Sequence, residues 1–334
     1  VSIRENNAKQ VPRCRNGAED EKASASRSFR MKELNEMETR DMPPLRRAQW
    51  KKKFFPYLLM SPTLLLVLIF LIIPLAFAFY CSLYRCDYMQ FSKFMGLQNY
   101  ADVLMDPDIL ASIGRSFFVS MLSLVLALVL GVLLALWIHM LTKGAAYILQ
   151  LLVLIPWVTS MIVAAMLWKW IFQDDTGLLN YLLSLFGVGN VGFLTDKTIA
   201  IYTLVFVMTW RVIGYVMIQV LAGLKAIPVE YEEAAKIDGA NKWQMFWRVR
   251  FPLLKTPMAL SAIIVGLSNL NNLNVPLTLL AGGPGTSTMV VAIEIYRMSF
   301  TSYHFGESSA LSIVLCLVNF LLTIFYMKAV KYEI

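Results

Sequence analysis

The chain has 334 residues, of which 58% are hydrophobic and only 16% are charged, and its mean hydropathy is +0.60. In soluble domains about a quarter of all residues are charged, so this composition excludes an ordinary soluble domain and indicates a membrane protein. The net charge of +8 is therefore interpreted as basic residues flanking membrane helices, and not as a surface that binds nucleic acid.

The N-terminal region, residues 1–50, is polar, carries basic patches and shows no apolar period. We expect a disordered cytoplasmic tail there, followed by a membrane domain over residues 51–334. Met31 and Met37 are alternative start sites, which leaves open whether residues 1–30 are made in the cell.

Six segments are long enough to cross a membrane, which takes about 20 apolar residues each. They run over Pro56–Tyr80, Phe117–Met140, Ala146–Phe172, Ile199–Leu224, Pro257–Leu280 and Ala310–Met327. The sequence therefore predicts an all-α membrane protein with six transmembrane helices.

Lys and Arg residues are unevenly divided between the two sides of these predicted helices. Fourteen flank the spans on the side that holds both termini and the loop over residues 225–255, and five flank them on the other side. Because basic residues gather on the cytoplasmic side of membrane proteins, we expect both termini and this loop to be cytoplasmic.

The usual patterns of catalysis and metal binding are missing from the sequence. His139 and His304 are far apart and near no carboxylate cluster, and the glycine-rich run at residues 282–285 lacks the lysine of a phosphate-binding loop. We therefore predict no metal site, no cofactor and no enzyme activity. Cys81 and Cys86 lie close together at the end of the first span, where an oxidised pair and two free thiols are both considered.

A charged, aromatic-rich stretch, EYEEAAKIDGANKWQMFWRVRFPLL, occupies residues 230–254 of the predicted cytoplasmic loop. Pro228 and the acidic residues after it are typical of a helix start, and the late basic residues suit a helix end. Gly239 indicates a bend, after which aromatic residues recur at helical spacing until Pro252 closes the segment. We expect two short helices that meet at this glycine and lie along the membrane.

Two interpretations of this stretch are available. An interfacial helix would rest Trp243 and Trp247 among the lipid headgroups. It explains the acidic residues poorly, because an anionic leaflet repels them. A helix pressed into a groove of a soluble protein partner explains both features better.

The same stretch contains a recognisable motif. Glu233-Ala234-Ala235, then Asp238-Gly239-Ala240, then Val249-x-Phe251-Pro252 resembles the EAA loop of binding-protein-dependent ABC importer permeases, with Val and Phe in place of Ile and Leu. The resemblance implies that the loop is the coupling helix, which docks on a separate ATPase subunit. The residues it assigns to coupling are Glu233, Ala234, Ala235, Asp238, Gly239, Ala240 and Pro252.

The resemblance extends over about residues 55–330. FMGLQNYADVL, GLLNYLL and NNLNVPLTLLAGGPGTST occur in the order typical of the carbohydrate branch of that family, which includes maltose and glycerol-phosphate permeases. It implies a type I ABC importer permease that crosses a bacterial-type cytoplasmic (inner) membrane several times. The implied partners are a second permease subunit that is a different chain, two ATPase subunits that bind ATP and Mg²⁺, an extracytoplasmic solute-binding protein, and a sugar as the substrate.

Two alternatives to a sugar importer are kept. The first is a permease of the same type for another solute, such as an amino acid, peptide or polyamine. The second is an autonomous secondary transporter, which would need no ATPase and would leave residues 230–254 unexplained.

Polar side chains inside a membrane span are costly and usually functional. The fourth predicted span carries Arg211, followed by Tyr215 and Gln219. Counted from Ile199, Arg211 lies about 18 Å into a hydrocarbon core of about 30 Å. This depth favours an arginine that faces the helix bundle over one that snorkels outward, and we assign Arg211 and Tyr215 to the substrate pathway.

The fifth predicted span carries four asparagines within six residues, and they cannot all face lipid. They are Asn269, Asn271, Asn272 and Asn274. Amide groups donate and accept hydrogen bonds, which suits the hydroxyls of a sugar, but they also join helices to one another. Both roles stay open, and the four residues are assigned to the substrate pathway. Pro276 predicts a local break in this helix.

Overall fold

The computed structural model describes residues 26, 29–30, 32 and 59–329. It divides into two compact units, residues 1–74 and residues 75–334, which are described separately. The predicted tail lies outside the described residues, apart from four positions between 26 and 32 that are helical. The first predicted span is a helix from Leu59 to Ser82, which includes a π-helical turn, η1 (Leu68–Ile72), and ends in α3 (Ile73–Ser82).

A short antiparallel hairpin follows this helix and was not predicted. β1 (Tyr84–Asp87) pairs with β2 (Gln90–Phe94). The turn residues Tyr88 and Met89 have φ angles of 52° and 64°, the left-handed backbone that a two-residue hairpin turn requires. Neither residue type favours that backbone, so the sequence contains no local turn pattern that would have revealed the hairpin.

Asn99 joins the hairpin to the next helix, α4 (Gln98–Met105). Its Nδ2 donates hydrogen bonds to the backbone carbonyls of Ser82 and Tyr84, at 2.8 and 3.0 Å. One buried amide therefore fixes the end of the first span against the start of the hairpin.

Cys81 and Cys86 lie on either side of that junction. Both are buried and both are free thiols in the structure. Burial raises the pKa of the Cys86 thiol, which keeps it protonated near neutral pH. Of the two states considered from the sequence, the structure contains the reduced one.

Two long helices form the centre of the second unit. α5 (Pro107–His139) begins ten residues before its predicted start, because Asp106 accepts hydrogen bonds from two backbone amides of its first turn. α9 (Lys197–Lys225) lies within two residues of its predicted bounds and is capped in the same way by Asp196. The two helices pack closely where a Cβ on Gly131 would come within 2.6 Å of Val216 Cγ1.

The third predicted span is not one straight helix, which corrects the prediction. α6 (Lys143–Val158) and α7 (Met161–Ile171) meet at an angle of 98°. Pro156 lacks the amide that an interior turn needs, and Thr159 and Ser160 adopt extended backbone angles. Continuous hydropathy across these residues hid the bend, since hydropathy does not report backbone direction.

The fifth predicted span begins earlier and ends earlier than expected. α11 (Lys242–Gln244), a π-helical segment η2 (Met245–Arg250) and α12 (Phe251–Leu270) form one continuous helix. It breaks after Leu270, and α13 (Asn274–Leu279) follows as a separate short helix. The break predicted from Pro276 is therefore present, a few residues before the proline.

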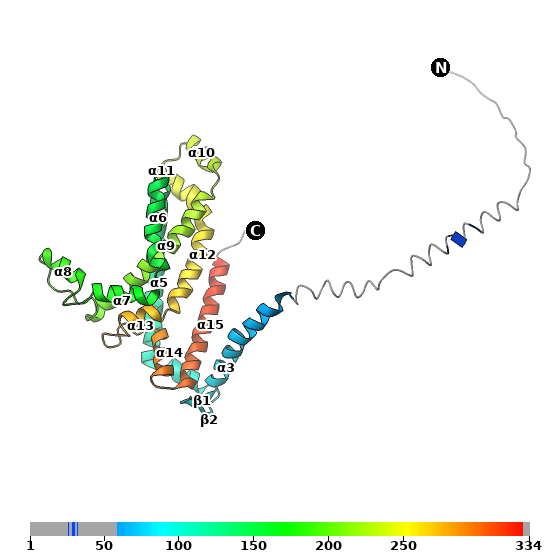
Figure 1. Cartoon of the computed structure of the whole chain (residues 1–334), viewed down its shortest axis with the longest axis vertical. Helices are drawn as coiled ribbons and strands as arrows, with labels where there is room; N and C mark the ends of the chain where they lie inside the picture. The colour runs from blue at the N-terminus through cyan, green and yellow to red at the C-terminus, as the bar shows by residue number, and fades with distance from the viewer. Residues whose placement is uncertain (1–25, 27–28, 31, 33–58, 330–334) are drawn as a thin grey trace, which may run out of the picture. The chain divides into compact units, whose positions relative to one another are not determined.

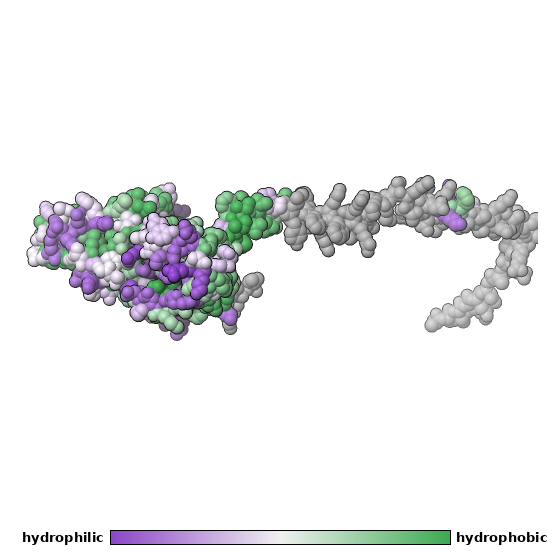
Figure 2. All heavy atoms as spheres, turned by 90° about the horizontal axis from the view of Figure 1, so that it is seen from below, coloured by the Kyte–Doolittle hydropathy of each residue, from purple (hydrophilic) through white to green (hydrophobic). Residues whose placement is uncertain are grey.

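The remaining helices complete the unit. They are α8 (Leu178–Leu185), α10 (Val229–Ile237), α14 (Val291–Phe300) and α15 (Phe305–Ala329), of which α15 contains the sixth predicted span. Figure 1 shows α10 and the β1–β2 hairpin at opposite ends of the second unit. Seen from the hairpin end, hydrophilic residues occupy much of the face and hydrophobic residues lie toward its rim (Figure 2).

The described residues contain five helices long and apolar enough to cross a membrane, or six if the bent pair α6–α7 counts as one span. Their mutual packing is centred on α9, in which 67% of an apolar 18-residue stretch is buried. The chain is therefore a predominantly helical membrane protein, as predicted, with an added hairpin and one sharply bent segment.

Candidate functional site

The 225–255 loop contains two helical arms that meet at a corner. The first arm, α10, has Glu230 and Glu232 in its first turn and is followed by Asp238 as its C-cap. Gly239 follows with φ at +77°, a left-handed backbone that suits glycine. Asn241 then starts the second arm with a capping box, in which its side chain and that of Gln244 bond each other's backbone amides.

Pro252 does not close the loop, which corrects the prediction. It lies in the first turn of α12, and the second arm runs on through it into the membrane helix. The proline lies where the helix changes from the wider π form to the α form, in the first turn of the α-helical part, a position that tolerates proline. The second arm and the fifth span are thus one rigid rod.

An ion pair braces the two arms, and it was missed in the sequence. The Arg250 guanidinium donates two hydrogen bonds to the Glu232 carboxylate, from Nε at 2.9 Å and from Nη2 at 3.1 Å. Both side chains are only 20% exposed. The guanidinium holds the pKa of Glu232 below its usual range. These residues are 18 positions apart, so no short sequence spacing marks them as partners.

The predicted coupling residues lie on the exposed part of this structure. Glu233, Ala234, Asp238, Gly239 and Pro252 are exposed, and Ala235 and Ala240 are half-buried. No residue of α10 is buried.

Large apolar side chains are exposed beside these residues. Ile237 is 86% exposed, Trp243 70% and Val229 64%. Trp243 packs edge-on against Trp247, with 5.6 Å between the ring centroids. Trp247 in turn contacts Phe251, with 4.9 Å between the centroids. A braced helix that shows apolar side chains to its surroundings is typical of a surface that binds another protein.

A second group of predicted residues gathers in the middle of α9. Gly214 lies against the backbone of α6, where an added Cβ would sit 2.2 Å from the Val153 carbonyl oxygen. This close approach brings Trp157 of α6 next to Arg211 and Tyr215. The Arg211 guanidinium lies 5.5 Å from the centre of the Trp157 ring, and Trp157 stacks on Tyr215 at 4.6 Å.

Arg211 is buried, as its predicted depth required, with 5% of its surface exposed. Its Nε has no hydrogen-bond partner among the described residues. A cation over an aromatic ring gains about 0.5–2 kcal/mol, whereas burying a charge costs several kcal/mol. The aromatic contact therefore offsets only part of the cost of this position.

The four asparagines differ in burial and in their partners. Asn269 is buried with its Nδ2 unpartnered within residues 59–329. Asn271 is exposed and exchanges two hydrogen bonds with Asn319 of α15, at 3.2 and 2.9 Å. Asn272 is buried, and its Oδ1 accepts from the Val275 amide at the start of α13.

Asn272 and Asn274 meet the bent third span. Their amide nitrogens lie 3.9 and 3.8 Å from the sulfur of Met161, the first residue of α7. Trp157 lies just before the bend and Met161 just after it, so the bend links the asparagines to the Arg211 group. Two helix breaks that meet at membrane depth are tolerated only beside protein or a water-filled cavity.

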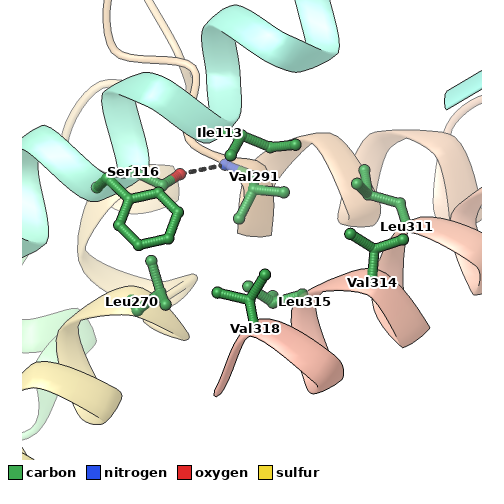
Figure 3. Close-up of a pocket in the computed structure, with 9 residues that line it drawn as sticks. Ile113, Ser116, Leu270, Val291, Leu311, Val314, Leu315 and Val318 are labelled. Carbon is green, nitrogen blue, oxygen red and sulfur yellow. Dashed lines mark hydrogen bonds between the residues drawn. The ribbon is translucent and has the colours of Figure 1, made fainter. Parts of the chain in front are cut away.

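A small apolar pocket lies elsewhere, between α5, α12, α14 and α15. Its lining includes Leu270, Leu311 and Val318, and the Ser116 hydroxyl there is already bonded to the Val291 amide (Figure 3). None of the predicted site residues lines it. It has no free polar group to bind a sugar, so we do not assign it to the substrate pathway.

Comparison with known proteins decides the class of protein. Residues 123–330 match the family described as "Binding-protein-dependent transport system inner membrane component". The chain belongs to this family. The permease is 31% identical over 291 residues to the trehalose/maltose transport system permease protein MalF of Thermococcus litoralis, covering 86% of this chain and 97% of MalF.

A further relative agrees with this membership, and a solved structure shares the fold. The permease is 31% identical to the sn-glycerol-3-phosphate transport system permease protein UgpA of Agrobacterium fabrum, covering 84% of this chain and 95% of UgpA. A solved bacterial alginate ABC transporter, in complex with an alginate pentasaccharide-bound periplasmic protein, contains a chain of the same fold. It has a TM-score of 0.74 and 24% identity, and the match covers 85% of this chain and 96% of that chain.

The family defines what the chain is. It is a membrane-spanning permease subunit of a binding-protein-dependent importer, its relatives are carbohydrate and glycerol-phosphate permeases, and it is a transporter subunit and not itself an enzyme. The resemblance read from the sequence is thereby confirmed.

Proposed function

We propose that this permease forms half of the translocation pathway of an ATP-driven sugar importer and that its 225–255 loop docks on a separate ATPase subunit. One observation carries the proposal. α10 is braced by the Arg250–Glu232 pair yet buries none of its residues, and it leaves Ile237 86% exposed. A helix that is held rigid without being packed can transmit force to or from a partner that covers it.

The orientation follows from charge. The loop shares its side of the predicted membrane with fourteen flanking basic residues, which supports a cytoplasmic loop with both termini on the same side. In this arrangement α6 and α7 together count as the third of six spans, and the hairpin β1–β2 lies on the extracytoplasmic side.

Four kinds of partner complete the importer in this proposal. The solved alginate transporter, with its bound periplasmic protein, supports an extracytoplasmic solute-binding protein. Two ATPase subunits would supply ATP and Mg²⁺, which this chain has no phosphate-binding loop to hold. A second permease subunit would supply the other half of the pathway.

The substrate pathway is proposed to run past the bend in the third span. Trp157, beside Arg211 and Tyr215, lies just before that bend, and Met161, beside Asn272 and Asn274, lies just after it, which supports this assignment. Asn269 and Asn271 would flank the pathway on the fifth span. MalF and UgpA, by their names, act on trehalose or maltose and on sn-glycerol-3-phosphate. Neutral and phosphorylated solutes thus both occur among the relatives.

The docking proposal is tested by photocrosslinking within the assembled importer. A crosslinking residue at position 237 should capture the ATPase subunit. The control places the same residue at Phe186, which is 83% exposed just after α8, beyond the opposite end of α9. If position 237 yields only lipid adducts, or the ATPase is captured equally from position 186, the docking assignment is wrong.

A further inference from the structure

A buried cation in the middle of α9 has no partner within the described part of the chain. Arg211 is the fifteenth of the 29 residues of α9, and 5% of it is exposed. Across residues 59–329 its guanidinium makes neither a hydrogen bond nor an ion pair, and its Nε is fully enclosed. Arg250 has a carboxylate partner and Arg115 a backbone carbonyl, so other arginines of the chain are satisfied where Arg211 is not.

The guanidinium lies against a pair of stacked aromatic rings. Trp157 lies against it, and Tyr215 stacks on the Trp157 ring. The amide nitrogen of Gln219 donates to the Tyr215 hydroxyl at 2.9 Å, so the hydroxyl hydrogen remains available to a further acceptor. The close contact of Gly214 with α6 fixes the distance between the two helices at this level. The result is a set of oriented donors that have no acceptor among the described residues.

An anion is the ligand that this arrangement fits. A guanidinium presents a planar fork of N–H donors that matches two oxygens of a carboxylate, phosphate or sulfonate. A neutral hydroxyl would accept one of these hydrogen bonds and would leave the buried charge uncompensated. We propose that Arg211 binds the anionic group of the transported solute, and that this permease carries an acidic or phosphorylated sugar.

The remainder of such a solute has donors and acceptors close by. The amide nitrogens of Asn272 and Asn274 point at the Met161 sulfur, which is a weak acceptor. Better acceptors, such as sugar hydroxyls, would displace that contact. Because Trp157 and Met161 flank the same bend, the anionic end of the solute would meet Arg211 and its hydroxyls would meet the asparagines. This inference rests on the proposed function, since it needs these residues to line the pathway.

The test measures uptake by the complete importer, with its binding protein, second permease and ATPase, in proteoliposomes. The probes are sn-glycerol 3-phosphate, glucuronate and maltose. The wild type should transport at least one of the anionic probes, and in preference to maltose. Arg211→Gln should reduce uptake of that anion about tenfold or more, while the ATPase remains bound. Arg211→Lys keeps the charge but loses the fork, so it should retain more uptake than Arg211→Gln with a raised KM.

Three results would overturn the inference. The first is a wild-type preference for maltose, which needs no variant and so does not depend on how Arg211→Gln folds. The second is anion uptake by Arg211→Gln at the wild-type rate. The third is that Arg211→Gln loses the second permease on purification, which would show that Arg211 pairs with a carboxylate of that subunit.

Failure of the proposed function would look different. An ATPase that does not bind the wild-type complex, or that responds to none of the probes and drives no uptake, contradicts the importer assignment as a whole. Normal maltose uptake that is indifferent to Arg211 contradicts only the anion site.

Discussion

The 225–255 loop and the Arg211 group differ in which of their groups find partners within the chain. In the loop, Glu232 and Arg250 neutralise each other within the chain, and apolar side chains such as Ile237 stay exposed. Around Arg211, aromatic side chains pack together, and within residues 59–329 the charge has no partner. Each region therefore presents groups that a ligand would satisfy. The loop presents apolar surface to a protein, and the Arg211 group presents hydrogen-bond donors to a polar solute.

This difference also separates two kinds of experiment. Changes at the loop corner should damage coupling without damaging the fold, because the loop carries little buried surface. Changes near Arg211 should alter packing and solute recognition together, because α9 is the most buried of the five single helices in the described chain that are long enough to cross a membrane.

The largest effect is expected at Gly239. A Cβ there would meet nothing within 4 Å, so added bulk does not disturb this chain, but its φ of +77° strains any β-branched residue. Left-handed backbone costs a residue with a Cβ about 1–2 kcal/mol of conformational free energy, so Gly239→Val should straighten the corner. Solute-driven ATP hydrolysis should then fall about tenfold or more. Gly239→Asn, which tolerates left-handed backbone, is the matched variant and should keep most of the activity.

Two outcomes at Gly239 would change this interpretation. Wild-type coupling in Gly239→Val would remove the corner from the mechanism. Equal loss in both variants would show that the ATPase approaches the backbone too closely for any side chain, so that contact and not backbone shape requires glycine.

The next effect is expected at Gly214. An alanine Cβ would lie 2.2 Å from the Val153 carbonyl oxygen, so α6 and α9 must move apart. Gly214→Ala should destabilise the permease by about 1–3 kcal/mol, seen as a lower unfolding temperature in detergent. Gly114→Ala is the control, because nothing lies within 4 Å of its Cβ on α5, and there alanine should stabilise by about 0.5–1 kcal/mol. Equal unfolding temperatures for the two variants would contradict the close packing at Gly214.

A smaller effect is expected at the ion pair. Glu232→Gln should lower stability by about 1 kcal/mol, because both side chains are partly exposed. The pKa of Glu232 is lowered in the folded state, so the pair contributes fully above the unfolded pKa of about 4.3 and is lost as the pH falls through the folded pKa. The difference in unfolding temperature between wild type and Glu232→Gln should thus be constant from about pH 8 to pH 5 and shrink below about pH 4.

Glu230→Gln serves as the control for this pH dependence. Glu230 is exposed in the same first turn of α10, and it makes no ion pair within residues 59–329. Its substitution should change stability less and without the same loss at low pH. A difference for Glu232→Gln that persists at pH 3 would mean that packing, and not charge, holds the two arms together.

The sequence was informative where function depends on local pattern. The EAA stretch revealed both helical arms and the Gly239 corner, and the depth of Arg211 along its span indicated that it is buried. It failed where a feature depends on contacts between distant residues. The Glu232–Arg250 pair, the 98° bend at residues 159–160 and the meeting of that bend with Asn272 arise from helix packing, which hydropathy does not encode.

The smallest predicted effect concerns Asn271 and Asn319, and it separates the two roles left open for the asparagines. Their reciprocal hydrogen bonds join α12 to α15, as expected of a contact between helices. A double-mutant cycle with Asn271→Leu and Asn319→Leu should show a coupling energy of about 0.6 kcal/mol in stability, typical of such pairs in membranes.

The transport readout of the same cycle completes the comparison. Asn272, buried at the bend, is the residue that we place beside the solute, so Asn272→Ala should reduce uptake, and Asn271→Leu should leave uptake near the wild-type rate. If Asn271→Leu instead abolishes uptake while the stability coupling is absent, the pathway runs along the exposed face of α12 towards α15. The solute would then bypass Arg211, and the opposite treatment of charge in the two regions would have nothing to do with transport.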